Sequence, residues 1–353
     1  MPAAEQPAPR SLKLHTVSDD VPGIRRNRRG QEFVYCDFKG RPVRDRGTLA
    51  RIRSLAIPPA WTAVWICPEP KGHIQATGRD ARGRKQYRYH PDWVICREAG
   101  KTDRLTTLAA ALPTIRRRVR RDLSRSGMPR EKVLALMVRL VELTAIRPGH
   151  REYARTNHSY GLATMQDGHA TIKQQRVDFS FSGKGGKQHL LTVDDPKVSR
   201  LVRRCRDLRG RALFQYEETN GRPRAVHATD LNAYLKAISG ADVTAKDLRT
   251  WSATILACRL LRRRGQAAST TEAKRNVKDT ICAVAEHLGN TPAICRKSYI
   301  HDAIIQAYGE GKLPLQSDKS SGSLSPVETL VRNLIQSYDA LYEVRIVKPP
   351  SRA

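Results

Sequence analysis

One short segment of the sequence combines a tyrosine with several cationic side chains. Residues 290–305, NTPAICRKSYIHDAII, place Tyr299 close to Arg296, Lys297 and His301. These residues fit two interpretations: a solvated helix face, or a phenol nucleophile directed at a phosphate group. The choice depends on whether the rest of the chain supplies the other groups that phosphate chemistry requires.

The sequence lacks the usual means of metal-dependent or nucleotide-dependent phosphate chemistry. It has neither the carboxylate clusters that hold two metal ions nor the G-x-x-x-x-G-K-[ST] pattern of a phosphate-binding loop. Asp194 and Asp195 are adjacent, but neighbouring carboxylates on a strand point to opposite faces. Pro196 follows them, which favours a helix cap. We therefore predict that any phosphodiester chemistry uses no metal, no nucleotide and no other cofactor.

Metal-free phosphate transfer needs a nucleophile, cations on the non-bridging oxygens and an acid for the leaving oxygen. Arginine suits the second role because its planar fork binds two phosphate oxygens. Lysine suits the third because neighbouring cations readily lower its pKa. The candidate catalytic residues, in chain order, are Arg147, Lys184, Arg249, Asn290 and Tyr299.

Each candidate also has an ordinary structural explanation. Arg147 follows a predicted helix, where an arginine is commonly a solvated charge. Lys184 lies in GKGGK, the tip of a predicted hairpin, where surface lysines are common. Lys246 and Arg249 begin an apolar helix, where the helix dipole disfavours cations unless an anion or Asp247 offsets them. The candidates therefore gain significance only as a set.

The composition indicates a polyanionic partner. Among 353 residues, 64 are Lys or Arg and 34 are Asp or Glu, which gives a net charge of +30. Such a charge favours nucleic acid first and an anionic membrane second. The sequence has no apolar run of about 18 residues, no apolar signal-peptide core near its start, and no C-x-x-C pair among its seven cysteines. We therefore expect a cytoplasmic protein whose first candidate partner is nucleic acid.

The chain length allows about two domains, and the sequence patterns predict an α+β fold. Residues 1–20 are rich in Pro and Ala, and we expect them to be flexible. Residues 21–98 contain runs such as QEFVYCDF and HIQATGRD between Gly, Pro and Asp, which indicates a small β-rich domain. Residues 101–345 are predicted to form a mainly α-helical catalytic domain, followed by a tail at 346–353.

One β-hairpin is predicted to interrupt the helices of the catalytic domain. The segment ATIKQQRVDFSFSGKGGKQHLLTVDD alternates polar and apolar residues on both sides of its Gly-rich tip. Before it, Pro113 is expected to bend or restart a helix that follows Gly100. Apolar spacing of three and four residues predicts later helices at 196–208, 229–239, 244–264, 271–288, 292–299 and 325–338.

The order of an arginine, a hairpin lysine, a K-x-x-R pair and a late tyrosine resembles the type IB DNA topoisomerases, in particular the compact poxvirus-like class found in bacteria. The similarity is carried by IRPGHREYARTNHSYGL, AKDLRTWSAT and NTPAICRKSYIH. A fourth stretch, residues 72–90, resembles the DNA-contacting part of the family's β domain. The resemblance therefore covers both predicted domains.

The resemblance implies a role for each candidate. Tyr299 corresponds to the nucleophile that forms a 3′-phosphotyrosine bond, Arg147 and Arg249 to the clamp on the scissile phosphate, and Lys184 to the acid for the leaving 5′ oxygen. Asn290 stands nine positions before the tyrosine, where poxvirus relatives have histidine. An asparagine donates a hydrogen bond to a phosphate oxygen but carries no charge. That contact is therefore expected to be weaker and neutral.

The resemblance also implies DNA contacts outside the catalytic set. In GRDARGRKQYRYH it places three side chains in the major groove and on phosphates, although two core tyrosines on a basic strand would explain the same pattern. The arginine runs at 116–121 and 262–264 are either phosphate contacts or solvated helix faces. The predicted DNA-binding residues are Gln86, Tyr87, Tyr89, Tyr153, Lys246, Arg296 and Lys297.

Two other functions fit parts of the sequence. A tyrosine recombinase shares the helical fold and phosphotyrosine chemistry, but recombinases have H-x-x-R where this chain has K-D-L-R, and a helical N-terminal domain. A non-enzymatic DNA-coating protein explains the charge but not the ordered set. The resemblance instead implies a nucleoid-associated monomer that clamps double-stranded DNA. It would relax positive and negative supercoils by nicking, strand rotation and religation, without ATP or metal.

Overall fold

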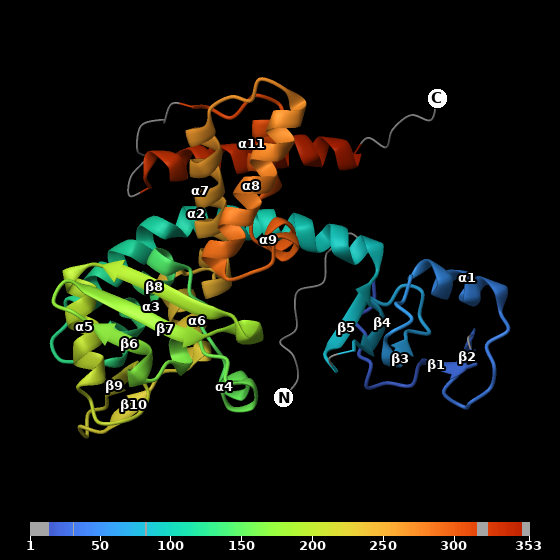
Figure 1. Ribbon diagram of the computed structural model, residues 1–353, viewed down its shortest axis with the longest axis horizontal. Helices are drawn as coiled ribbons and strands as arrows, with labels where there is room; N and C mark the ends of the chain where they lie inside the picture. The colour runs from blue at the N-terminus through green and yellow to red at the C-terminus, as the bar shows by residue number, and fades with distance from the viewer. Residues whose placement is uncertain (1–13, 31, 82, 316–323, 348–353) are drawn as a thin grey trace. The chain divides into compact units, whose positions relative to one another are not determined.

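The computed structural model describes residues 14–30, 32–81, 83–315 and 324–347, and it confirms the predicted α+β fold class (Figure 1). The chain forms two compact units, the first ending at Lys101 and the second beginning at Thr102. Within the described residues, no helix combines the length and the apolar character needed to cross a membrane.

The first unit contains one antiparallel sheet with the strand order β2-β1-β3-β4-β5. Its core is a small cluster that includes Ile24, Val64 and Ile66. Ile52 of a short helix completes this cluster, and the Asp45 side chain caps that helix by accepting from the Thr48 amide at 2.6 Å. The strands are β1 (Ile24–Arg29), β2 (Glu32–Cys36), β3 (Thr62–Ile66), β4 (Ile74–Arg79) and β5 (Lys85–Tyr89), and the helix, which was not predicted, is α1 (Arg46–Ser54).

The segment before the sheet contacts the first unit at two points. Residues 1–13 of the predicted flexible stretch lie outside the described residues. His15 forms a parallel bridge with Gly72, and Asp19 accepts from Thr77 Oγ1 and Lys85 Nζ, both at 2.8 Å. The flexibility expected for residues 1–20 stays a prediction.

The second unit is mainly helical. Its helices are α2 (Pro91–Leu123), which begins in the first unit, α3 (Arg130–Thr144), α4 (Arg151–Asn157), α5 (Pro196–Arg206), α6 (Ala228–Ser239), α7 (Ala245–Arg264), α8 (Thr270–Leu288), α9 (Pro292–Ser298), α10 (Asp302–Gly309) and α11 (Pro326–Val347). Short 3₁₀ turns are η1 (Leu162–Thr164), η2 (Asp167–His169) and η3 (Lys184–Gly186). The later predicted helices are confirmed, with shifted ends.

Helix α2 differs from its prediction in two ways. It begins at Pro91 rather than after Gly100. Proline suits the first turn of a helix, and the Asp92 amide donates to His90 Nδ1 at 3.1 Å. It also continues through Pro113, so no new helix starts there. At the other end of the chain, α11 extends to Val347, so the predicted tail begins later than residue 346; residues 348–353 lie outside the described part.

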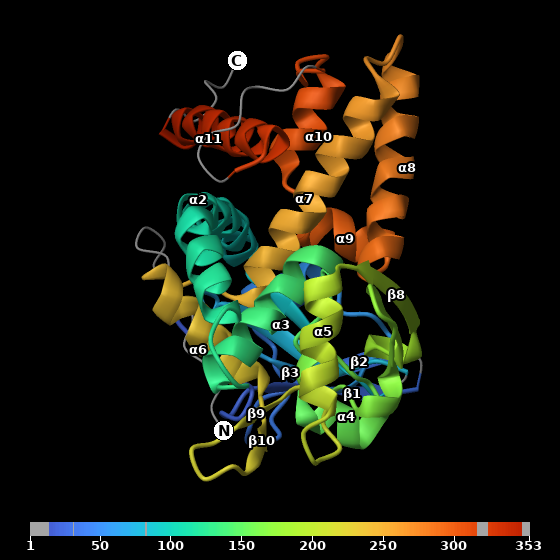
Figure 2. The same cartoon turned by 90° about the vertical axis from the view of Figure 1, so that its left-hand side faces the viewer.

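The predicted hairpin is part of a larger sheet. Strands β7 (Arg176–Ser182) and β8 (Gln188–Asp194) pair around the tip, and β6 (Ala170–Ile172) adds a third strand in the order β6-β7-β8. A second hairpin, β9 (Gln215–Glu217) with β10 (Pro223–Ala225), was not predicted because its strands have three residues each. Helix α5 packs on the three-stranded sheet (Figure 2), and Asp195 caps it as predicted.

Three helices of the second unit, α3, α7 and α8, carry most of the candidate site. α3 contacts α5, α6, α7, β8 and β9, and this explains why its residues 132–138 are all buried. α7 and α8 lie side by side (Figures 1 and 2). The C-terminal end of α3, the N-terminal end of α7 and the C-terminal end of α8 therefore emerge from well-packed elements.

Candidate active site

Arg147 lies just beyond the end of α3. The helix ends at Ala145, which has a left-handed backbone with φ 52°, and the chain then turns toward Arg147. The Arg147 carbonyl accepts from the Leu162 amide at 2.8 Å. Gly149 and Gly161 approach so closely that a β-carbon on Gly149 would lie 2.8 Å from the Gly161 α-carbon. These contacts fix the backbone from which the Arg147 guanidinium extends.

Lys246 and Arg249 lie in the first turns of α7. Asp247 belongs to the capping box of this helix and accepts from the Thr244 amide at 2.9 Å. Asp247 also binds Arg104, with Nη2 to Oδ2 at 2.6 Å, so it does not directly pair with the cations beside it. Arg249 is only 2% exposed, whereas Lys246 is exposed.

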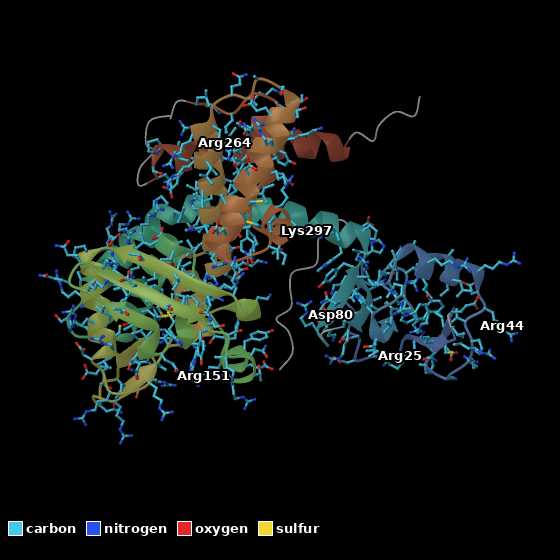
Figure 3. All side chains as sticks on the ribbon, viewed as in Figure 1. Arg25, Arg44, Asp80, Arg151, Arg264 and Lys297 are labelled. Carbon is cyan, nitrogen blue, oxygen red and sulfur yellow. The ribbon has the colours of Figure 1, made fainter. Side chains whose placement is uncertain are left out.

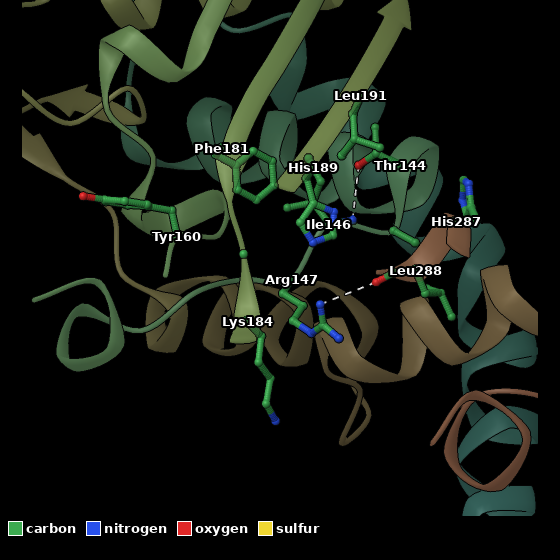
Figure 4. A pocket seen from close by; sticks show the side chains of 12 residues that line it. Thr144, Ile146, Arg147, Tyr160, Phe181, Lys184, His189, Leu191, His287 and Leu288 are labelled. Carbon is green, nitrogen blue, oxygen red and sulfur yellow. Dashed lines mark hydrogen bonds between the residues drawn. The ribbon is translucent and has the colours of Figure 1, made fainter. Parts of the chain in front are cut away.

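The two arginines converge on the C-cap segment of α8, residues Leu288, Gly289 and Asn290. The Leu288 carbonyl accepts from Arg147 Nη1 at 3.5 Å (Figure 4). It also accepts from Arg249 Nη2 at 3.5 Å. Arg147 Nη2 also donates to Asn290 Oδ1. Among the described residues, no carboxylate forms an ion pair with either guanidinium. Two like charges are thus held together without an anion.

Two hydrogen-bond donors of this cluster are buried and have no partner among the described residues. They are Nε of Arg249 and Nδ2 of Asn290. Because Asn290 directs its oxygen at Arg147, its amide nitrogen is the group left over. Buried donors normally have partners, so these two indicate a missing acceptor.

Tyr299 joins the same cluster from the end of α9. The guanidinium carbon of Arg249 lies 5.5 Å from the centre of the Tyr299 ring. The Tyr299 amide donates to the Cys295 carbonyl at 2.9 Å, and the Tyr299 carbonyl accepts from Thr254 Oγ1 of α7 at 3.2 Å. The phenol is therefore held against the helix that carries Arg249.

The pKa values of Arg249 and Tyr299 are shifted by burial and by neighbouring cations. Burial, helped by the charge of Arg147, lowers the pKa of Arg249 to about 10, although Tyr299 opposes the shift. Burial would raise the pKa of the Tyr299 phenol, but Arg249, Arg147 and Lys246 outweigh it and lower that pKa below its ordinary value. A lowered pKa increases the phenolate fraction and so favours a nucleophilic role.

Lys184 lies at the hairpin tip between β7 and β8. It lines the same cavity as Arg147 and His189, but its side chain extends away from His189 (Figure 4). Its amine has no hydrogen-bond or ion-pair partner in the described part of the chain. The structure thus brings Arg147, Arg249, Asn290 and Tyr299 together and leaves Lys184 at the rim.

The residues predicted to bind DNA in the first unit lie on β5. Tyr87 is 41% exposed and stacks on Tyr89 with ring centres 5.8 Å apart. Gln86 is partly buried, and its Nε2 donates to Asp80 Oδ2 at 2.9 Å. Tyr87 therefore offers an accessible ring, whereas Gln86 already binds within its own unit.

The remaining predicted contacts belong to the second unit. Tyr153 on α4 is 57% exposed, and Lys297 on α9 is exposed (Figure 3). Arg296 donates to Asp302 of α10. Of the two cations that precede Tyr299, Arg296 is thus already paired with a carboxylate of the protein.

Parts of the two arginine runs have structural roles. Arg116 pairs with Glu142 and Glu328, and Arg118 pairs with Asp122 at 2.9 Å. Arg264, at the C-terminal end of α7 (Figure 3), pairs with Asp279 at 3.4 Å. Arg116, Arg118 and Arg264 therefore form internal salt bridges, a role that neither of the two interpretations, phosphate contact or solvated helix face, included.

The sequence analysis missed His189. This residue faces the cavity from β8, directly opposite Phe181 in the β7–β8 register. The alternating burial of β8 places His189 on the same side as Leu191 and Val193. The H-x-L-x-V spacing therefore predicts a histidine on the buried face of the strand.

Comparison with known proteins gives consistent results for both units. Residues 93–321 match the family described as eukaryotic DNA topoisomerase I, catalytic core, and residues 32–80 match bacterial DNA topoisomerase IB, N-terminal domain. DNA topoisomerase 1B of Acanthamoeba polyphaga mimivirus is 30% identical over 323 residues, which cover 90% of this chain and 95% of the relative. DNA topoisomerase I of Monkeypox virus and DNA topoisomerase 1B of Vaccinia virus (strain Copenhagen) are each 22% identical over 230 residues, covering 65% of this chain and 70% of the relative.

These matches relate to the candidate residues in different ways. The first family match includes the whole candidate catalytic set, from Arg147 to Tyr299. The β5 residues Gln86, Tyr87 and Tyr89 fall between the two matched ranges. Neither family range therefore includes the proposed β5 contacts.

Proposed function

Because this chain belongs to the type IB DNA topoisomerase family, we propose that it relaxes supercoiled DNA through a transient 3′-phosphotyrosine bond to Tyr299. It is an isomerase, and DNA is its substrate. The observation that carries the proposed mechanism is the cluster of Arg147, Arg249, Asn290 and Tyr299, in which two cations and two unpartnered donors have no carboxylate partner among the described residues.

A scissile phosphate supplies the missing anion. Its non-bridging oxygens accept from the guanidinium groups of Arg147 and Arg249, whose forks suit paired contacts. Asn290 Nδ2 adds a neutral donor. The cations are gathered before DNA binds, so little reorganisation accompanies the build-up of negative charge in the transition state.

The cleavage step exchanges one phosphodiester for another. Tyr299 Oη forms a bond to phosphorus while the bond from phosphorus to the 5′ oxygen breaks. The phenol proton passes to solvent, and Lys184 donates a proton to the 5′ oxygen, which leaves as a hydroxyl. Two positive-φ glycines, Gly185 and Gly186, follow Lys184 at the hairpin tip, and we propose that this tip brings the amine to the leaving group when DNA is bound.

Religation is the same step in reverse. The phosphotyrosine keeps the energy of the cleaved bond, so the 5′ hydroxyl restores the strand without ATP. Between the two steps the cut strand rotates about the intact one, driven by torsional strain in the DNA. We further propose a monomer that contacts the duplex with both of its units and that requires no metal or nucleotide.

The test is a relaxation assay on negatively and positively supercoiled plasmid, in EDTA and without nucleotide. The wild-type protein is expected to relax both, whereas Tyr299→Phe is expected to bind DNA and relax neither. Denaturation during the reaction should leave the protein on the 3′ end of the break. Strict dependence on Mg²⁺ or ATP, or attachment to the 5′ end, would reject the mechanism. A coating protein would be unaffected by Tyr299→Phe.

A further inference from the structure

His189 has no role in the mechanism above, yet it occupies a central place beside it. Its ring stacks on Phe181 across the hairpin, with ring centres 5.0 Å apart and planes 7° apart. The pair lies at the base of the tip that carries Lys184, where Ser182 pairs with Gln188 and the Gly183 amide donates to the Lys187 carbonyl at 2.8 Å. The stacked rings therefore lie one register pair below the end of the hairpin ladder that carries the proposed acid.

The ring is enclosed by two glycines from distant parts of the chain. A β-carbon on Gly183 would lie 2.5 Å from Cδ2 of His189, and one on Gly289 would lie 2.1 Å from Cε1. Real β-carbons do not come so close, so both positions must lack a side chain to admit the imidazole. His189 thus fills the space between the hairpin and the C-cap segment of α8.

That C-cap segment is also the anchor of the two catalytic arginines. Leu288 accepts from Arg147 and Arg249, Asn290 accepts from Arg147, and Gly289 lies between them with φ +62°. A side chain that packs against Gly289 therefore ties the hairpin to the segment that binds the phosphate clamp.

The charge state of the ring suits this place. Burial, followed by the charges of Arg147, Lys187 and Arg249, lowers the pKa of His189 to about 4. The imidazole is therefore neutral at neutral pH. A neutral ring can pack beside the arginines without adding to their mutual repulsion.

We propose that His189 is a positioning residue for Lys184. Its ring, clasped between Gly183 and Gly289 and stacked on Phe181, fixes the base of the hairpin so that Lys184 reaches the leaving 5′ oxygen. This inference rests on the proposed function, in which Lys184 protonates that oxygen. It goes beyond that function because it assigns to a neutral ring the coupling between the acid and the phosphate clamp.

The test separates proton donation from the other parts of the reaction. Single-turnover cleavage is measured at a site mapped with the wild-type enzyme, on an ordinary strand and on one with sulfur in place of the 5′ bridging oxygen. In the second substrate, Tyr299 Oη bonds to phosphorus and the phosphorus–sulfur bond breaks. Sulfur leaves as a thiolate, because thiols are far more acidic than alcohols, so it needs no proton from Lys184.

His189→Ala is expected to cleave the oxygen substrate about 10–100-fold more slowly, the scale of a small misplacement of a catalytic group. On the sulfur substrate its rate should return close to the wild-type rate. Lys184→Ala should show the same rescue, whereas Arg147→Ala should stay slow on both substrates. His189→Phe should retain most of the activity because its ring can still stack on Phe181. Leu190→Ala, at the neighbouring position that is 79% exposed, is the control and should match the wild type.

Equal slowing of His189→Ala on both substrates would overturn the proposal, and so would wild-type rates on both. If circular dichroism shows that His189→Ala is unfolded, His189→Gln, which lacks the ring, takes its place with the same two outcomes. Failure of the wild-type enzyme to form any covalent adduct would instead reject the proposed function. The two failures are thus distinguishable.

Discussion

Two arginine sites in the second unit, the partly buried Arg116 and the buried Arg249, differ in what surrounds them. Arg116 binds Glu142 at 2.9 Å and Glu328 at 2.6 Å, and these contacts link α2, α3 and α11. Arg249 binds a backbone carbonyl, faces Arg147 and has no carboxylate partner in the described part of the chain. Both side chains leave water on folding, but only the first gains a compensating negative charge.

The pKa shifts express this difference. Burial would lower the pKa of Arg116, but Glu328 and Glu142 outweigh it and raise that pKa above the ordinary value. Burial and the charge of Arg147 lower the pKa of Arg249 to about 10. A buried cation without a counter-ion is costly, so it is expected where a ligand supplies the anion. The absence of carboxylate partners among the described residues, rather than the arginines alone, therefore marks the proposed catalytic pocket.

The largest expected effect is the loss of cleavage activity in the Arg249→Ala variant. Removing this contact to the phosphate should slow single-turnover cleavage by about 10²–10³-fold, the scale of losing one donor to a charged transition state. Stability in a urea titration should be unchanged or higher, because an unpaired buried charge is removed. The exposed Arg263→Ala on the same helix is the matched control and should cleave normally. A strongly destabilised Arg249→Ala with normal cleavage would contradict the comparison.

The converse effect is expected for Arg116→Ala. This change leaves Glu328 buried without its partner and should lower the free energy of unfolding by about 3 kcal/mol. At a temperature where the variant is folded, its cleavage rate should stay near the wild-type rate. Urea titration and single-turnover cleavage measure the two quantities. A cleavage defect as large as that of Arg249→Ala, at full stability, would place Arg116 in the catalytic machinery instead.

A smaller effect is expected on the way in which the stability of the fold depends on pH, through the ionisation of Glu328. Burial would raise the pKa of this carboxyl, but Arg116 and Ser325 outweigh it and lower it to about 2, from an ordinary value of 4.5. A depressed pKa stabilises the fold above pH 4.5, and this contribution disappears as the pH falls toward 2. Glu328→Gln should therefore be less stable than the wild type at pH 7, and the gap should narrow on acidification. Thermal unfolding across that range measures it, and a constant gap would refute the assignment.

The smallest effect concerns Asn290. Asn290→Ala removes one neutral donor and should slow cleavage by only about 2–10-fold, the scale of a single neutral hydrogen bond. Asn290→His offers a charge-capable donor and should cleave faster than Asn290→Ala at low pH. Single-turnover rates between pH 5 and 8 test this order. A loss as large as that of Arg249→Ala would show that the neutral contact matters as much as the charged one.

Local patterns were sufficient for much of the architecture. The alternation on both sides of GKGGK correctly located β7 and β8, and the apolar spacing located α5 to α9 and α11. The elements that were missed, α1, α4, α10 and the β9–β10 hairpin, are short. The Glu217 amide of β9 donates to the distant Met128 carbonyl at 3.0 Å.

The sequence by itself determined the chemical inventory: a tyrosine, two arginines, a hairpin lysine and an asparagine, in an order that carries the family resemblance. Only the tertiary structure decided which cations are paired. Arg104 meets Asp247, Arg116 meets Glu328, and Arg296 meets Asp302, while Arg147 and Arg249 share the Leu288 carbonyl.

The reason is physical. A salt bridge forms between groups that packing brings within about 4 Å, and most of these partners lie more than a hundred positions apart in the chain. Spacing along one helix or strand cannot encode such a meeting. The place of His189 between Gly183 and Gly289 depends in the same way on how α8 ends against the hairpin.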